Sequence, residues 1–255
     1  MIQHTYKIEE LNSAWLYEQY FFGIPLIDPD GNKISDKVAE FAIAQAIGQL
    51  ENDLMLYIRQ RDDIEERHDY DLEIYSNFCF LQLWKRPIRA ITSFTIMYGN
   101  NTVEILDNAW IIYQAKMGIM QLYPGTIVSS TGMYFSGLWP MLHWQAKAPM
   151  AFKLIYNAGF DDIPAQMAHA IGMLASIHLF NILGDLVIGA GIASMSIGMD
   201  GWSQSIGTTA SAENSAYSAR IIMYQKELYG YNVGSPGLID RLKTEYEIPS
   251  IARLG

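Results

Sequence analysis

The sequence predicts an α+β protein, with a helical core formed from both ends of the chain and a β-rich region inserted between them. Apolar residues recur at helical spacing before residue 67 and again after residue 158. Between these positions the sequence consists of short apolar runs separated by turn residues. We therefore divide the chain into 1–66, 67–158, 159–230 and a C-terminal tail, 231–255.

The first part contains an apolar segment at 8–22, a polar turn at 28–32 and a predicted long helix. Ser35 is a suitable N-cap residue, and Asp36 follows in the first helical turn. Apolar residues then recur every three or four positions, at Val38, Phe41, Ala42, Ala46, Ile47, Leu50, Leu54 and Ile58. This spacing predicts an amphipathic helix that ends in the charged run 59–66.

The inserted region is predicted to be β-rich. Its turn Gly99-Asn100-Asn101 is typical of a hairpin. The strand-like runs lie at 78–84, 91–98, 103–106, 109–114, 119–123, 133–135 and 151–156. Their regular spacing predicts a small sandwich or barrel.

The second helical part begins with Asp161, Asp162 and Pro164, which are typical of a helix start. We expect this helix to end at Gly184. The following segment, 186–206, is rich in Gly, Ser and Ile without helical periodicity, so we expect a β-hairpin or an ordered loop. A second helix is predicted at 209–229, and one or two helical turns at 238–246.

Composition limits the function. The formal net charge of −10 disfavours tight binding of nucleic acid, because an acidic surface repels phosphate. A single cysteine, Cys79, excludes an intrachain disulfide bond. Only 17% of the residues are charged, which suggests that partners cover much of the surface. We see no signal peptide in the first ten residues and expect folding in a reducing cytoplasm.

No motif predicts catalysis, a cofactor or a metal site. The segment 186–194 resembles the start of a dinucleotide fingerprint, but Gly198 and Gly201 disfavour the helix that must follow it. His169 and His178 are nine residues apart and fall on opposite faces of the predicted helix, so they cannot share a metal. We expect no enzyme, although an oligomeric enzyme of unrecognised type stays open.

The apolar stretch 165–199 is long enough to span a membrane. However, Asp185 lies within it, and no Lys or Arg occurs between Lys153 and Arg220 to anchor its ends. A helix buried in an oligomer explains the stretch better. A small membrane-active protein that uses 165–199 is the alternative.

Three segments carry a resemblance to a known family. They are Lys85-Arg86-Pro87-Ile88-Arg89-Ala90-Ile91, Met117-Gly118-Ile119-Met120-Gln121-Leu122 and the segment from Phe152 through Asn157-Ala158-Gly159-Phe160-Asp161-Asp162-Ile163 to Pro164. They resemble, in order, the Pro-led start of a strand, a later Gly-led strand, and a strand that passes through an aromatic-x-x-Gly-aromatic turn into a Pro-started helix, all in the head–tail connector (adaptor) family of tailed bacteriophages. The resemblance covers roughly 35–185. The larger β region and the segment 186–208 depart from the smaller family members.

The resemblance implies a structural virion protein at the neck of the particle. Such a protein forms a ring of about twelve copies beneath the portal and joins the head to the tail. DNA passes through the central channel without specific binding, and no membrane is involved. Its partners are other copies of itself, the portal protein and a tail or neck protein below, and it is made in the host cytoplasm.

Two segments are candidate contact sites within this role. The tail is a candidate arm onto the portal or a neighbouring copy, with a loose terminus as the alternative. The arm residues are Leu238, Ile239, Leu242, Tyr246, Ile248, Ile251 and Leu254. The Gly/Ser-rich segment is a candidate channel- or tail-facing hairpin. Its apolar residues are Leu186, Ile188, Ile192, Met195, Ile197 and Trp202.

Overall fold

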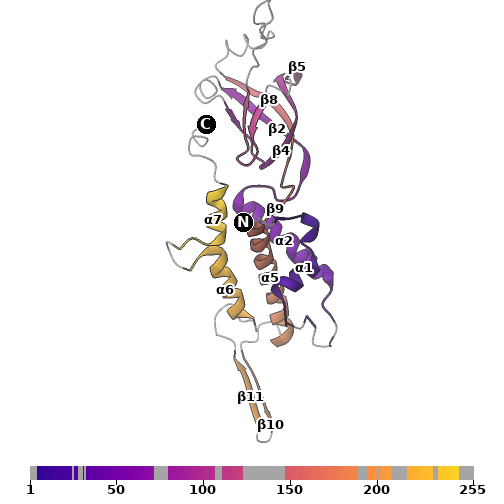
Figure 1. Ribbon diagram of the computed structural model, residues 1–255, viewed down its shortest axis with the longest axis vertical. Helices are drawn as coiled ribbons and strands as arrows, with labels where there is room; N and C mark the ends of the chain where they lie inside the picture. Colours follow the sequence, from indigo (N-terminus) through magenta and orange to yellow (C-terminus); the bar gives the residue numbers. More distant parts are fainter. Residues whose placement is uncertain are drawn as a thin grey trace, which may run out of the picture. The chain divides into compact units, whose positions relative to one another are not determined.

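The chain is an α+β protein, as predicted, and it consists of two compact units (Figure 1). This computed structural model describes residues 5–24, 26–27, 31, 33–71, 80–106, 111–122, 147–188, 194–199, 202–207, 217–231 and 235–246. One unit, here called the helical unit, comprises Met1–Leu54 and Asp162–Glu245. The other, the β unit, comprises Met55–Asp161 and Tyr246–Gly255.

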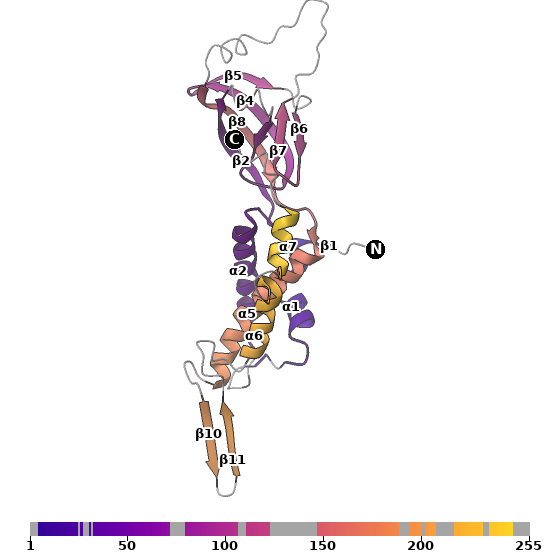
Figure 2. The same cartoon turned by 90° about the vertical axis from the view of Figure 1, so that its left-hand side faces the viewer.

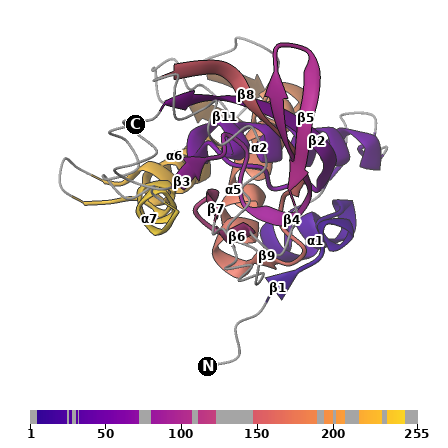
Figure 3. The same ribbon diagram turned by 90° about the horizontal axis from the view of Figure 1, so that it is seen from above.

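The helical unit is built around one long central helix, α5 (Ala165–Ile188), against which the other helices pack (Figure 3). Those helices are α1 (Ser13–Tyr20), α2 (Asp36–Leu54), α6 (Ser218–Tyr229) and α7 (Leu238–Glu245). The unit also contains the 3₁₀ turn η1 (Ile8–Glu10) and the short pair β1 (Thr5–Tyr6) and β9 (Ile163–Pro164). Most side chains of α5 between Met167 and Leu183 are buried, which accounts for its apolar composition, although His169, Asn181 and Ile182 are exposed.

Helix α2 begins where the sequence predicts but ends earlier. Its buried residues are Ala39, Ala42, Ile43, Ala46, Ile47, Leu50 and Leu54, five of which were predicted; Ala39 and Ile43 were not, and the predicted Val38 is only partly buried. Phe41, expected on that face, is 63% exposed. The prediction that the helix continues into the charged run 59–66 was wrong, because the helix ends at Leu54 and residues from Arg61 onward form a strand.

The β unit contains two antiparallel sheets. The larger sheet has the order β2-β8-β4-β5 and the smaller one the order β3-β7-β6. The strands are β2 (Arg61–Asp71), β3 (Phe80–Gln82), β4 (Ile88–Tyr98), β5 (Asn101–Leu106), β6 (Ile111–Gln114), β7 (Ile119–Leu122) and β8 (Lys147–Ala158). The predicted hairpin turn joins β4 to β5, where Tyr98 pairs with Asn101.

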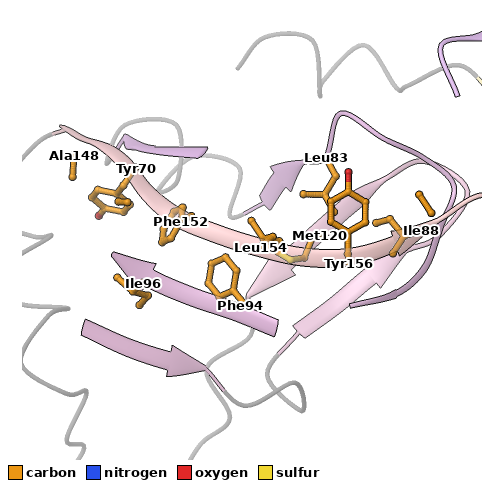
Figure 4. Packing of buried hydrophobic residues seen from close by; sticks show 12 residues of the cluster. Tyr70, Leu83, Ile88, Phe94, Ile96, Met120, Ala148, Phe152, Leu154 and Tyr156 are labelled. Atoms are coloured by element: carbon orange, nitrogen blue, oxygen red, sulfur yellow. The ribbon is translucent and has the colours of Figure 1, made fainter. Parts of the chain in front are cut away.

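Both sheets contribute to one hydrophobic core (Figure 4). Phe94 and Phe152 come from adjacent strands of the larger sheet, and their ring centroids are 5.3 Å apart. Tyr70 meets Phe152 edge-on at 5.8 Å. Met120 from the smaller sheet is fully buried in the same cluster. Such aromatic pairs add about 0.5–1.5 kcal/mol beyond the burial of their area.

The Gly/Ser-rich segment forms the expected hairpin, but it starts later than predicted. Strands β10 (Ser194–Met199) and β11 (Trp202–Gly207) pair with each other (Figure 2). Helix α5 does not end at Gly184, which is itself buried, but continues to Ile188. A glycine inside a helix costs about 0.5–1 kcal/mol, which burial of the surrounding apolar residues offsets. The predicted strand 133–135 and the first residues of the predicted helix at 209–229 lie outside the described residues.

Candidate functional site

The three segments that carry the family resemblance lie together in the β unit, except for the last three residues of the third segment, 162–164. The N–H of Gly159 donates to the carbonyl of Pro87 at 2.9 Å, and Ile88 pairs with Ala158 across β4 and β8. A Cβ atom built onto Gly118 would lie 3.1 Å from the Cβ of Arg86. We call residues 85–91, 117–122 and 152–161 the motif junction.

Gly159 shows why the turn of this motif needs glycine. Its φ angle is +112°, in a region that side chains disfavour. A Cβ atom at this position would also lie only 2.5 Å from the carbonyl oxygen of Arg59. The tight approach lets the next residue, Phe160, donate its N–H to the carbonyl of Ile58 at 3.3 Å. The glycine therefore closes the end of β8 against the segment that precedes β2.

Arg86 of the motif junction is a buried cation that binds backbone carbonyls. Its Nε donates to the carbonyl of Met55 at 3.4 Å, and its guanidinium also donates to the carbonyl of Tyr246. Met55 and Tyr246 are the residues at which the chain passes into the β unit after α2 and after α7. The phenyl ring of Phe160 meets the ring of Tyr246 edge-on at 5.8 Å. Arg86 thus links the segment that follows α2 to the segment that follows α7 through hydrogen bonds to their backbone carbonyls.

The outer edge of the motif junction is closed by ion pairs. Arg89 lies between two carboxylates, with its Nη1 3.1 Å from Asp62 and its Nε 2.8 Å from Asp161. The side-chain amide of Gln60 also donates to Asp161 at 3.0 Å. The two carboxylates are about two-thirds exposed, so each pair contributes little to stability on its own. These ion pairs fix the position of Arg89. The Arg89–Asp161 pair joins the first resemblance segment to the last.

Glu66 is the most deeply buried carboxylate among the described residues, at 4% exposure. It accepts hydrogen bonds from the Tyr156 hydroxyl and from the backbone N–H groups of Trp84 (3.1 Å) and Lys85 (3.2 Å). The His68 ring lies 3.0 Å from its second oxygen. Burial opposes ionisation, but the hydrogen bonds from His68, Tyr156 and the Trp84 amide outweigh it and hold the pKa of Glu66 below its usual range. This side chain ties β2 to β8 and to the segment that leads into the motif junction.

A second polar chain joins three helices of the helical unit. The Tyr20 hydroxyl lies 2.8 Å from Nδ1 of His169, and Nε2 of His169 lies 3.2 Å from Glu227. Burial raises the pKa of Tyr20, so its hydroxyl stays protonated and donates. These partners of His169 could not be predicted from the sequence, because Tyr20 lies 149 residues and Glu227 58 residues away along the chain. The contact is a tie between α1, α5 and α6.

The predicted arm is not a free segment over its first half. Leu238, Ile239 and Leu242 are buried in α7, within the helical unit, and Tyr246 is buried at 4% exposure. These four residues are therefore already covered by this chain, which corrects their assignment to an arm. Ile248, Ile251 and Leu254 lie outside the described residues, and the arm prediction now concerns only 247–255.

The candidate hairpin residues divide in the same way. Met195 and Ile197 lie in β10, and Trp202 begins β11, where it pairs with Met199. Leu186 and Ile188 belong to α5 and not to the hairpin, a correction that follows from the longer helix. Ile192 lies outside the described residues.

Helix α5 has the length and apolar composition of a membrane span over Ala165–Gly184, yet 72% of that window is buried inside the protein. Burial by its own neighbouring helices explains its composition without a membrane. Within the part of the chain that the structure describes, no group of three or more His, Cys, Asp or Glu side chains is placed to hold a metal ion.

No protein-family model matches this chain, and no curated protein matches it either.

Proposed function

We propose that this chain is a structural protein of a tailed-bacteriophage virion, the head-to-tail adaptor beneath the portal. About twelve copies form a ring that surrounds the DNA channel and joins the DNA-filled head to the tail. The observation that carries the proposal is the motif junction. Segments taken from three separate parts of the sequence, each chosen for its likeness to the connector family, adjoin through the Gly159–Pro87 hydrogen bond, the β4–β8 pairing and the packing of Gly118 on Arg86.

The helical unit supplies a physical reason for a ring. A ring that closes needs two different faces on each subunit, so that every copy meets the next in the same way. Helix α5 is covered by α1, α2, α6 and α7, and the outward sides of these helices remain for neighbours. Large apolar side chains are exposed at Phe22, just after α1, at Phe41 on α2 and at Met223 on α6, where a neighbouring copy could cover them.

The charge of the chain suits a channel through which DNA slides. At a formal net charge of −10, a ring of these subunits repels phosphate and does not grip passing DNA. The proposed partners are further copies of this chain, the portal protein above and a tail or neck protein below. The proposed location is the virion neck, after synthesis in the host cytoplasm.

The proposal is tested by measuring the mass of the purified full chain, alone and mixed with the portal protein of the same phage. We expect a closed ring of about twelve copies bound to the portal, whether or not the chain forms rings alone. An unrelated acidic protein of similar size, mixed with the portal under the same conditions, is the control for non-specific binding. A chain that stays monomeric with the portal, and that is missing from the neck in images of virions, would overturn the proposal.

A further inference from the structure

We propose that the outward side of α1 and α2 in one copy docks onto the outward side of α6 and α7 in the next copy. This inference rests on the proposed ring and names the two surfaces that form it. The α1–α2 face comprises the exposed residues of η1, α1, the residue Phe22 and α2. The α6–α7 face comprises the exposed residues of α6 and α7 together with Tyr231. Figures 1 and 3 show α1 and α6 on different sides of α5.

The two faces differ in charge. Five exposed carboxylates lie on η1, α1 and α2: Glu9, Glu10, Glu18, Asp36 and Glu40. Two exposed lysines oppose them, Lys37 on α2 and Lys33, which lies just before α2 and pairs with Asp36 at 3.1 Å. On α6 and α7 the cations Arg220, Lys226, Arg241 and Lys243 stand against Glu227, Asp240 and Glu245. Glu227 is already bonded to His169. In a chain of net charge −10, α6 and α7 thus form a surface onto which an acidic face can dock without net repulsion.

Each face places an apolar side chain among its charges. Phe22 is 90% exposed, and Phe41 is 63% exposed on α2, where Lys37 lies one helical turn before it. On the opposite face Met223 is exposed, and Arg220 and Lys226 flank it three residues away on either side. An apolar centre with a charged rim is the usual anatomy of a protein interface. Fully burying a phenylalanine contributes about 1.5–3 kcal/mol, so two exposed rings give the contact a useful driving force.

The charges also determine which kind of contact forms. Two α1–α2 faces repel one another, so a two-fold dimer through this surface is disfavoured. A contact between unlike faces leaves one free face of each kind at the two ends of the assembly. Further copies can therefore be added until the ends meet and a ring closes. The charge pattern therefore favours the head-to-tail contact that a ring requires.

The test is a charge exchange between the two faces. One variant carries Glu18→Lys and Glu40→Lys, and the other carries Arg220→Glu and Lys226→Glu. All four side chains are exposed. Arg220 also lies 5.8 Å from the ring centroid of Phe180, so folding of each variant is first checked by circular dichroism and thermal unfolding. The first variant changes the net charge of the α1–α2 face from −3 to +1, and the second changes that of the α6–α7 face from +1 to −3. We expect neither variant alone to form rings on the portal, because each then carries two faces of the same sign.

An equal mixture of the two variants provides the rescue. Each changed face then meets a changed face of opposite sign, and each natural face meets a natural one, so the copies alternate around the ring. We expect the mixture to restore at least half of the ring yield of the natural chain, with both masses present in equal numbers. A control that carries Asn100→Lys and Gln114→Lys, both exposed in the β unit and outside the motif junction, should assemble as the natural chain does.

The outcomes separate the two proposals. Either folded face variant forming rings alone with the natural yield overturns the pairing of these faces. A mixture of folded variants that stays unassembled overturns it as well. A natural chain that forms no ring with or without the portal overturns the proposed function itself.

Discussion

Replacing Glu66 with glutamine removes a charge that three hydrogen-bond donors depend on. The side chain is 4% exposed and accepts from the Tyr156 hydroxyl and from the backbone N–H groups of Trp84 and Lys85. A glutamine amide presents an NH₂ group in place of one carboxylate oxygen. At least one of the donors then faces another donor and loses its acceptor inside the protein.

The expected cost follows from these bonds. A hydrogen bond to a charged group contributes about 1.5–3 kcal/mol, and a buried donor without an acceptor costs about 1–3 kcal/mol. We expect Glu66→Gln to lower the free energy of unfolding of the β unit by about 2–4 kcal/mol. Because about 1.4 kcal/mol corresponds to a factor of ten, this is a loss of about 30- to 800-fold in protection against opening.

Amide hydrogen exchange on the peptide that contains Trp84 and Lys85 measures this loss of protection at the two backbone N–H groups that Glu66 accepts from. The matched control is Glu65→Gln, on the same strand. The Glu65 carboxylate is nearly half exposed and lies 2.9 Å from Nζ of Lys153. We expect the control to leave exchange at Trp84 and Lys85 unchanged. Natural protection in the Glu66→Gln variant would refute the view that this carboxylate fastens the segment.

The same carboxylate predicts a pH dependence. The folded pKa of Glu66 is lowered, while the unfolded value is about 4.3. A lowered folded pKa contributes stability that is fully present above the unfolded value and is lost as the pH falls through the folded value. We expect the free energy of unfolding of the natural chain, measured in urea, to fall below about pH 4.3. In the Glu66→Gln variant it should fall less over the same range. Equal slopes in both proteins would contradict the assignment.

Three further predictions concern packing. Gly172→Ala places a Cβ atom inside the ring of Tyr20, so it should lower the free energy of unfolding by about 1–3 kcal/mol. Gly48→Ala, whose Cβ atom would have no neighbour within 4 Å, should raise it by about 0.4–1 kcal/mol. Thermal unfolding of the two variants tests this difference. Gly159→Ala should cost more than about 2 kcal/mol in urea unfolding, because of its positive φ angle and the backbone oxygen 2.5 Å away; a neutral result would contradict the turn geometry. Leu242→Ala should cost about 2–5 kcal/mol because the side chain is buried, and unchanged unfolding would place α7 outside the core.

Local pattern was sufficient for the elements whose neighbours lie close along the chain. The three- and four-residue spacing from Val38 to Leu54 predicted most of the buried face of α2, and Gly99-Asn100 predicted the turn between β4 and β5. Both signals come from adjacent residues, which a sequence displays directly.

The charged run 59–66, which includes the first residues of β2, shows where prediction from the local sequence pattern fails. Alternating acidic and basic residues suit the exposed end of a helix, and 59–66 was interpreted in that way. The structure instead pairs Glu66 and its neighbours with β8, and Glu66 finds its hydrogen-bond donors at Trp84, Lys85 and Tyr156. Those donors lie 18 to 90 residues away along the chain, so no window around Glu66 contains the information that makes it a strand residue.

Helix α5 shows why the surfaces that bind other copies could not be located from the sequence. Its sequence is strongly apolar, so the pattern alone did not separate burial in an oligomer from burial within this chain. The structure covers α5 with helices of its own chain, and the apolar residues of α7 are used in the same unit. Surfaces left for other copies are therefore the outward sides of the covering helices, where isolated rings such as Phe22 stand among charges. A contact of this kind relies on opposite charges in water, which salt screens, so ring formation on the portal should weaken as ionic strength rises.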